Sequence, residues 1–250
     1  MENDVELFLI GGGWSEQARE LVYGPFLSAA ARDGGEPTVA CLVLDEGDGP
    51  EQFARWRDAL AATGPCTPVP VLVPEGARLD VAALPAADAL LVCGGLTPAY
   101  AAALSPVAAQ LRAWLAQGRR PYAGFSAGAA VAAECAVVGG WLREGRPVCP
   151  EDAAEDLEEI EPVPGLGFVP FAVDVHAAQW GTLGRLVAAV GAGLVSAGVA
   201  LDEGALLTVR EALVEVGGTG LAHLVRPGPD GGVVVQSFAA GQQIAGLLPG

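Results

Sequence analysis

The sequence predicts an α/β fold in which a mostly parallel sheet is covered by helices on both faces. In the first half of the chain, short apolar runs that end at glycines or polar turns are followed by segments of helical composition, and this pattern repeats several times. Hydrophobic residues make up 52% of the 250 residues, enough for a sizeable core, but only 6% of the residues are aromatic. Ala, Val, Leu and Gly must therefore fill most of that core, and such small side chains suit closely packed α/β layers.

The first half of the chain is predicted to alternate strands and helices. Residues 5–10 form an expected strand that ends in a tight turn at Gly11-Gly12-Gly13. Ser15 is expected to cap the following helix, whose apolar face would include Ala18, Leu21 and Val22. The further expected strands are 38–44, 69–73, 89–93 and 121–125, and the expected helices are 50–62, 98–117 with a break near Pro106, and 127–136.

The C-terminal third is predicted to be richer in strands. Residues 151–164 are acidic and bounded by prolines, which predicts an exposed loop or a short helix and not a domain boundary. The strands expected beyond this segment are 168–175, 194–201, 206–209, 222–225 and 232–238. Because the sequence has no internal repeat and no low-complexity linker, residues 1–250 are expected to form a single domain.

The formal net charge of −17 limits the partners of this protein. Nucleic acid and anionic lipid would repel such a chain, because phosphate groups are bound by clustered Lys and Arg. We therefore expect no nucleic acid and no membrane partner. The acidity serves solubility in the simplest interpretation, and in another it creates a field that favours cationic substrates.

The cysteine pattern and the N-terminus point to a protein of the cytoplasm. The five cysteines are odd in number and contain no CxxC pair, so neither a disulfide framework nor a zinc site is expected. Cys41, Cys93 and Cys135 lie in apolar runs and are expected to be buried. The start of the chain is acidic with a very short apolar run, unlike a signal peptide, and residues 186–201 are too short and glycine-rich to span a bilayer comfortably.

No metal or organic cofactor is expected. The sequence contains no plausible ligand cluster and no phosphate-binding loop. The run Gly11-Gly12-Gly13 lacks the GxGxxG spacing of a dinucleotide site and is interpreted as a turn.

The strongest local signal is Gly124-Phe125-Ser126-Ala127-Gly128, a G-x-S-x-G sequence between a predicted strand and a predicted helix. In this context the pattern indicates a nucleophile elbow, a tight turn that lifts the serine Oγ above the sheet. The N-terminus of the following helix would favour the negative charge that develops during acyl transfer.

A nucleophilic serine needs a base, and the chain has two histidines. His176 follows the apolar run 168–175, at the end of a strand where open α/β sheets bind ligands, whereas His223 lies inside an apolar strand and is interpreted as structural. The base in turn needs an orienting carboxylate, for which Asp174, Asp202 and Glu203 are the candidates.

The order of several motifs resembles peptidase S51, the family of the aspartyl dipeptidases and cyanophycinases. The motifs are Gly94-Gly95, GFSAGA, VGGW, GLGFVP, DVHAAQWGTLGRL and VALDEGALL, and the resemblance spans about residues 7–241. It implies a flavodoxin-like fold similar to the class I glutamine amidotransferases. It also implies that Ser126 is the nucleophile, His176 the base and Glu203 the third member, with the main-chain N–H groups of Gly95 and Ala127 as the oxyanion hole.

The chain departs from this family beside His176. Many relatives read D-x-H-F-x-x-R-x-R-x-x-R-L, and here only the last arginine remains, as Arg185, while Trp180 and Thr182 replace the first two. Neither replacement can grip a carboxylate with a bidentate fork, so aspartyl substrates are expected to bind poorly and an apolar or cationic group to be preferred. The residues expected to bind substrate are Asp174, Gln179, Trp180, Thr182 and Arg185.

The expected function is hydrolysis of an amide bond in a small peptide or isopeptide, through an acyl-enzyme on Ser126. Two alternatives stay open: an acyl-transfer enzyme that tailors a peptide natural product, and a non-catalytic binding protein on the same scaffold. A homodimer is compatible with the sequence.

Overall fold

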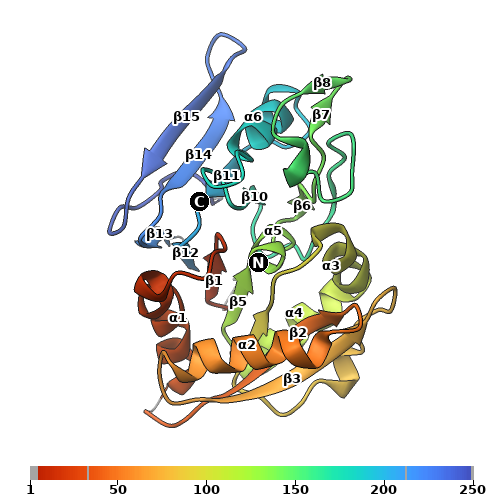
Figure 1. Ribbon diagram of the computed structural model, residues 1–250. Coiled ribbons are helices and arrows are strands. Elements are labelled where there is room, and N and C mark those ends of the chain that lie inside the picture. The colour runs from red at the N-terminus through yellow and green to blue at the C-terminus, as the bar shows by residue number, and fades with distance from the viewer. Residues whose placement is uncertain (1–4, 33, 212, 249–250) are drawn as a thin grey trace.

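A seven-stranded sheet forms the centre of the structure, a computed structural model that describes residues 5–32, 34–211 and 213–248 (Figure 1). Its strand order is β13-β12-β1-β5-β4-β2-β3, and the five strands from β1 to β3 are parallel. The antiparallel pair β12 and β13 extends the sheet beyond β1. The strands are β1 (Leu7–Ile10), β2 (Thr38–Asp45), β3 (Thr67–Pro74), β4 (Ala89–Val92), β5 (Tyr122–Phe125), β12 (Ala205–Arg210) and β13 (Leu213–Gly218).

Helices cover both faces of this sheet because its strands are apolar on both sides. In β1, Phe8 and Ile10 pack into the cluster formed with α1 (Glu16–Ala31) and α2 (Gly49–Ala61). The alternate residues Leu7 and Leu9 pack into the cluster formed with α3 (Thr97–Leu104) and α4 (Ala108–Gly118). The predicted α/β class with helices on both faces is confirmed.

A second sheet of four strands lies beside the first. Its order is β10-β11-β14-β15, where β10 (Ala172–Asp174) and β11 (Gly198–Leu201) are parallel and β14 (Ala222–Pro227) and β15 (Val233–Phe238) form an antiparallel hairpin. The helix α6 (Leu183–Gly191) packs on this sheet (Figure 1). The chain passes from the second sheet to the first through the turn between β11 and β12, so this turn lies where the two sheets meet.

Short elements complete the fold. They are α5 (Ala127–Ala130), β6 (Cys135–Ala136), β7 (Leu142–Arg143), β8 (Arg146–Pro147), β9 (Val163–Pro164) and the 3-10 turns η1 (Val81–Ala83), η2 (Ser105–Val107) and η3 (Glu151–Ala153). Among the described residues, no helix combines the length and the apolar character needed to cross a membrane.

Several local expectations were wrong. The helix expected over 127–136 ends after Ala130, and the strand expected over 168–175 covers only Ala172–Asp174. Most of the remaining apolar residues of both runs lie in buried loops. Leu21 is 50% exposed, since the buried side of α1 is formed by Ala18, Val22 and Phe26. Ser15 occupies the N-cap position without a side-chain capping bond.

Cys135 is exposed and therefore corrects the prediction of a buried thiol, whereas Cys41 and Cys93 are buried as expected. The strand β13 was not predicted. Its sequence alternates between apolar and polar residues, includes Glu215 and ends in two glycines, so its own tendency to form a strand is weak. Pairing with β12 stabilises it as a strand.

Candidate active site

Ser126 lies at a strained turn between β5 and α5. Its backbone has φ 52° and ψ −112°, a region that residues with a side chain rarely adopt, and strained residues of this kind cluster at functional sites. The flanking glycines are required by close approach of the backbone. A Cβ on Gly124 would lie 2.3 Å from the carbonyl oxygen of Gly128, and one on Gly128 would lie 2.2 Å from that of Val92. Ser126 therefore lies in the tight strand–turn–helix geometry that the G-x-S-x-G pattern predicted.

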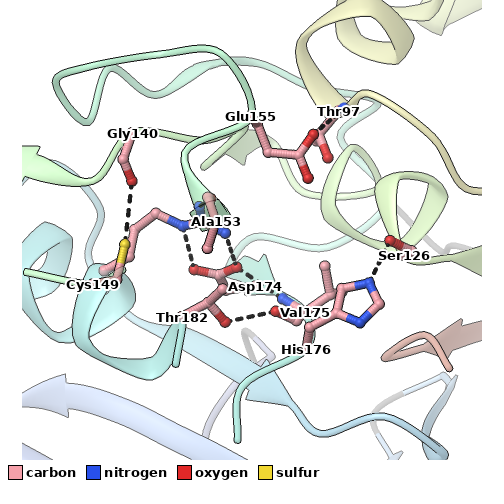
Figure 2. Close-up of polar contacts among 11 residues, drawn as sticks. Thr97, Ser126, Gly140, Cys149, Ala153, Glu155, Asp174, Val175, His176 and Thr182 are labelled. Atoms are coloured by element: carbon pink, nitrogen blue, oxygen red, sulfur yellow. Dashed lines mark hydrogen bonds and ion pairs between the residues drawn. The ribbon is translucent and has the colours of Figure 1, made fainter. Parts of the chain in front are cut away.

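His176 connects this serine to a carboxylate. Its Nε2 lies 2.8 Å from Ser126 Oγ (Figure 2), and its Nδ1 lies 2.8 Å from Glu203 Oε1. His176 follows β10, and Glu203 lies in the turn between β11 and β12. Three residues that are far apart in the sequence thus form one continuous chain of hydrogen bonds at the carboxyl ends of parallel strands, where open α/β sheets bind ligands.

Asp202 has a different role from its neighbour Glu203. Its Oδ1 accepts hydrogen bonds from the N–H of Ala178 and its Oδ2 from the N–H of Leu221, and His223 Nε2 lies 3.2 Å from Oδ1. These contacts anchor two loops, so the structure places Asp202 and His223 in a structural pair beside the site. Of the three carboxylates left open by the sequence, Glu203 is the one placed at the imidazole of His176.

The glycine run after β1, Gly11-Gly12-Gly13, packs against the side chains of His176 and Glu203. Gly12 has φ +105°, and a Cβ added to it would lie 2.1 Å from His176 Cε1. A Cβ on Gly13 would lie 2.7 Å from the Cβ of Glu203. The backbone also fixes the two partners, because His176 N–H donates to the carbonyl of Gly11 at 3.0 Å and Gly204 N–H donates to that of Gly12 at 2.9 Å. Sequence reasoning interpreted the run only as a turn, although its position at a strand's carboxyl end was the available signal.

Trp180 covers the ring of His176. The two ring centroids are 3.8 Å apart with an interplanar angle of 6°, a parallel stack. The N–H of Trp180 donates to the carbonyl of His176 at 2.8 Å, and this turn places the indole over the imidazole. Trp180 remains 42% exposed and lines the pocket, so one of its faces holds His176 while part of it is open to a ligand.

The environment of His176 favours the neutral form of its imidazole. Burial lowers its pKa below the ordinary value, and the hydrogen bond to Glu203 offsets only part of this effect. A neutral imidazole with Nδ1–H donated to Glu203 leaves Nε2 free to accept the proton of Ser126.

The two main-chain N–H groups that the family resemblance implies for an oxyanion hole are those of Gly95 and Ala127, and this role stays a prediction. Within the part of the chain that the structure describes, neither the N–H of Gly95 nor that of Ala127 has an acceptor in the protein. Gly95 lines the same pocket as Ser126, and Ala127 begins α5 directly after it.

Four of the residues expected to bind substrate do not line the cavity that contains Ser126. Asp174 and Arg185 are 1% and 3% exposed and form a bidentate pair, with Nε–Oδ2 and Nη2–Oδ1 distances of 2.9 and 2.7 Å. Thr182 is fully buried and donates to the carbonyl of Val175 at 2.6 Å (Figure 2). Gln179 accepts a hydrogen bond from the N–H of Glu203. Asp174, Thr182 and Arg185 are too buried to touch a substrate, which corrects their prediction, and their contacts instead hold the loop that carries His176 and Trp180. Gln179 is exposed, and its role in substrate binding stays a prediction.

A cavity of about 810 Å³ opens beside the serine and is strongly acidic. Ser126, His176, Trp180 and Glu203 all line it. Its other acidic lining residues in the described chain are Glu46, Asp48, Glu151, Asp152, Glu155, Asp156 and Glu158. In residues 5–32, 34–211 and 213–248, no group of three or more His, Cys, Asp and Glu side chains is arranged to hold a metal ion.

One comparison with solved structures agrees with this fold. No protein-family model and no curated protein matches the sequence. Among solved structures, a peptidase from an acI-B1 Actinobacterium is similar with a TM-score of 0.69 at 18% identity, covering 96% of each chain. A putative Peptidase E protein from Listeria monocytogenes EGD-e has a TM-score of 0.48 at 15% identity, covering 85% of this chain and 97% of its own. The first likeness shows that this chain shares the fold of a solved peptidase over nearly its whole length.

Proposed function

We propose that this protein is a serine hydrolase of the peptidase S51 type that cleaves an amide bond in a small peptide or isopeptide. The observation that carries the proposal is the chain Ser126–His176–Glu203, joined by two contacts of 2.8 Å beside an open cavity. The strained serine backbone and the two free main-chain donors add support.

The reaction would proceed through an acyl-enzyme. His176 Nε2 takes the proton of Ser126 while Oγ attacks the substrate carbonyl, and Glu203 stabilises the imidazolium that forms. The N–H groups of Gly95 and Ala127 bind the oxyanion, and one such donor is typically worth about 3 kcal/mol in the transition state. His176 then returns the proton to the leaving amine. Water, deprotonated by His176, then attacks the ester carbonyl of the acyl-enzyme, and the acid and the free serine are released.

Labelling with a fluorophosphonate probe tests whether Ser126 is activated. The wild-type protein is expected to form a covalent adduct on Ser126, and incubation with a peptide library is expected to release amine and acid products. Absence of both labelling and turnover would support a binding protein on this scaffold instead. Formation of a new amide when a second amine is added, without free acid, would support acyl transfer.

The acidic pocket predicts a preference for cationic substrates. Eight carboxylates line it, counting Glu203, and a cleft with such an excess of negative charge raises the encounter rate of cationic ligands by about tenfold or more. We expect kcat/KM for lysyl and arginyl peptides to exceed that for Asp-Leu by at least this factor, with the difference shrinking as salt is added. β-Asp-Arg is included because its arginyl side chain adds a cation to an aspartyl peptide. Faster cleavage of Asp-Leu at low salt would contradict the prediction.

Trp180 is expected to act on the base through its stacked face. The face of an indole stabilises a cation by about 0.5–2 kcal/mol, and His176 becomes cationic in the transition state. Trp180→Leu keeps apolar cover but removes the π face, so kcat should fall about twofold to thirtyfold, whereas Trp180→Phe should retain most activity. The pKa of His176 should also fall in the leucine variant.

Because the base must be deprotonated, that fall would move the acid limb of the kcat/KM profile to lower pH. The control is Trp114→Leu, which removes an indole that does not line the pocket. Identical pH profiles and kcat values for wild type and Trp180→Leu would show that the stack has no effect on the base.

A further inference from the structure

Arg55 is an isolated cation in the acidic pocket. It is the single Lys or Arg among the described residues that line the cavity of Ser126. Arg57, two residues further along α2, is paired with Asp58 at 2.8 Å and does not line this cavity. No acceptor within ion-pair or hydrogen-bond distance of Arg55 is found in the part of the chain that the structure describes, although Glu46 and Asp48 line the same cavity.

An aromatic cluster holds the guanidinium of Arg55 in the cavity that Ser126 also lines. The Arg55 Cζ lies 4.5 Å from the ring centroid of Trp14. Trp14 packs in turn against Trp56 and Phe125, with centroid distances of 4.6 and 5.4 Å. Phe125 directly precedes Ser126, so the platform that carries Arg55 is continuous with the elbow. Stacking occupies one face of the guanidinium and leaves the N–H groups in its plane available to a ligand.

The charge pattern defines what such a donor would bind. A guanidinium fork matches a carboxylate through two parallel hydrogen bonds. A ligand that carried only negative charge would be repelled by the eight carboxylates of the cavity, so the anionic group must belong to a molecule that also carries a cation. Small peptides with a free carboxylate and a basic or N-terminal amine have this composition.

We propose that Arg55 binds a free carboxylate of the peptide substrate, and thus that the pocket selects zwitterionic peptides over their C-terminal amides. The inference rests on the proposed peptidase function and adds a carboxylate subsite to it. The carboxylate is that of the peptide C-terminus or of an acidic side chain, which present the same chemistry to Arg55.

The test compares matched substrates in matched variants. Wild type is expected to cleave Lys-Leu with a kcat/KM at least about tenfold above that for Lys-leucinamide, since a hydrogen bond to a charged group is worth this much or more. In Arg55→Gln this preference should fall to near one, mainly through a higher KM for the free acid. Arg57→Gln removes the same formal charge from the same helix and should retain the preference. Melting curves establish that both variants are folded.

Two further measurements distinguish a C-terminal from a side-chain carboxylate, and a failure of the proposed function from a failure of this inference. Lys-Asp-amide and Lys-Asn-amide place the carboxylate on a side chain, so a preference for the former that depends on Arg55 assigns the subsite to an acidic side chain. Calorimetric titration of Lys-Leu and its amide into Ser126→Ala, with and without Arg55→Gln, measures binding without turnover. If no peptide is cleaved, the proposed function fails while this titration still tests Arg55. Equal affinity for acid and amide, or a preference that survives Arg55→Gln, would overturn the inference.

Discussion

Ser126→Ala is expected to lower kcat by a thousandfold or more and to leave the melting curve unchanged. The change removes one oxygen, and with it the atom that would form the bond to the acyl group. The elbow itself does not depend on that oxygen, because the N–H of Ser126 donates to the carbonyl of Ile10 at 2.9 Å and the flanking glycines are untouched. Alanine also keeps the β-carbon, so it adds no steric demand to the strained backbone.

The measurement combines steady-state hydrolysis with fluorophosphonate labelling. Wild type should be labelled and active, and Ser126→Ala should be neither, with binding of non-hydrolysed peptides preserved. Loss of a triad nucleophile removes most of the rate acceleration, and the remainder comes from the oxyanion donors and substrate binding. A variant with near-wild-type turnover and an unchanged melting curve would remove Ser126 from the mechanism.

The layered core could be predicted from the sequence because its signals are local. Runs such as 89–93 are short, apolar throughout and bounded by turns, and this pattern predicts a strand that is buried on both faces. The second sheet was predicted only as separate strands, since the partner of each strand is set by contacts distant in the sequence. The run containing Cys135 shows the limit of composition: the residue is apolar in context but lies on a two-stranded ribbon with its side chain exposed.

The candidate site divides in the same way. Ser126 and His176 follow predicted strands, and their position was predicted from those local patterns. The placement of Glu203 at the ring was anticipated only through the family resemblance. The pairing of Arg185 with Asp174 and the contact of Arg55 with the aromatic cluster of Trp14 could not be predicted, because each joins residues that only the fold brings together. An arginine in a sequence motif looks available to a ligand until its buried partner is known.

Gly12→Ala is expected to reduce kcat/KM by a hundredfold or more, although Gly12 contributes no side chain to the chemistry. The new Cβ would lie 2.1 Å from His176 Cε1, far inside van der Waals contact, so the imidazole or the glycine run must move. Either shift disturbs the 2.8 Å contacts to Ser126 and Glu203, and a displacement of about 1 Å at a reacting group typically costs about a hundredfold in rate. The φ of +105° adds strain of about 1–3 kcal/mol, which should lower the melting temperature.

A control separates strain from displacement of the base. Gly231 also has a positive φ, +77°, but a Cβ added there meets nothing within 4 Å, so Gly231→Ala should show a stability cost without the catalytic loss. A second readout follows the base directly: the proton on His176 Nδ1, donated to Glu203, should give a downfield imidazole resonance in wild type and in Gly231→Ala. In Gly12→Ala that resonance should move upfield or disappear with the activity. Wild-type turnover together with an unshifted resonance would show that the glycine run does not position His176.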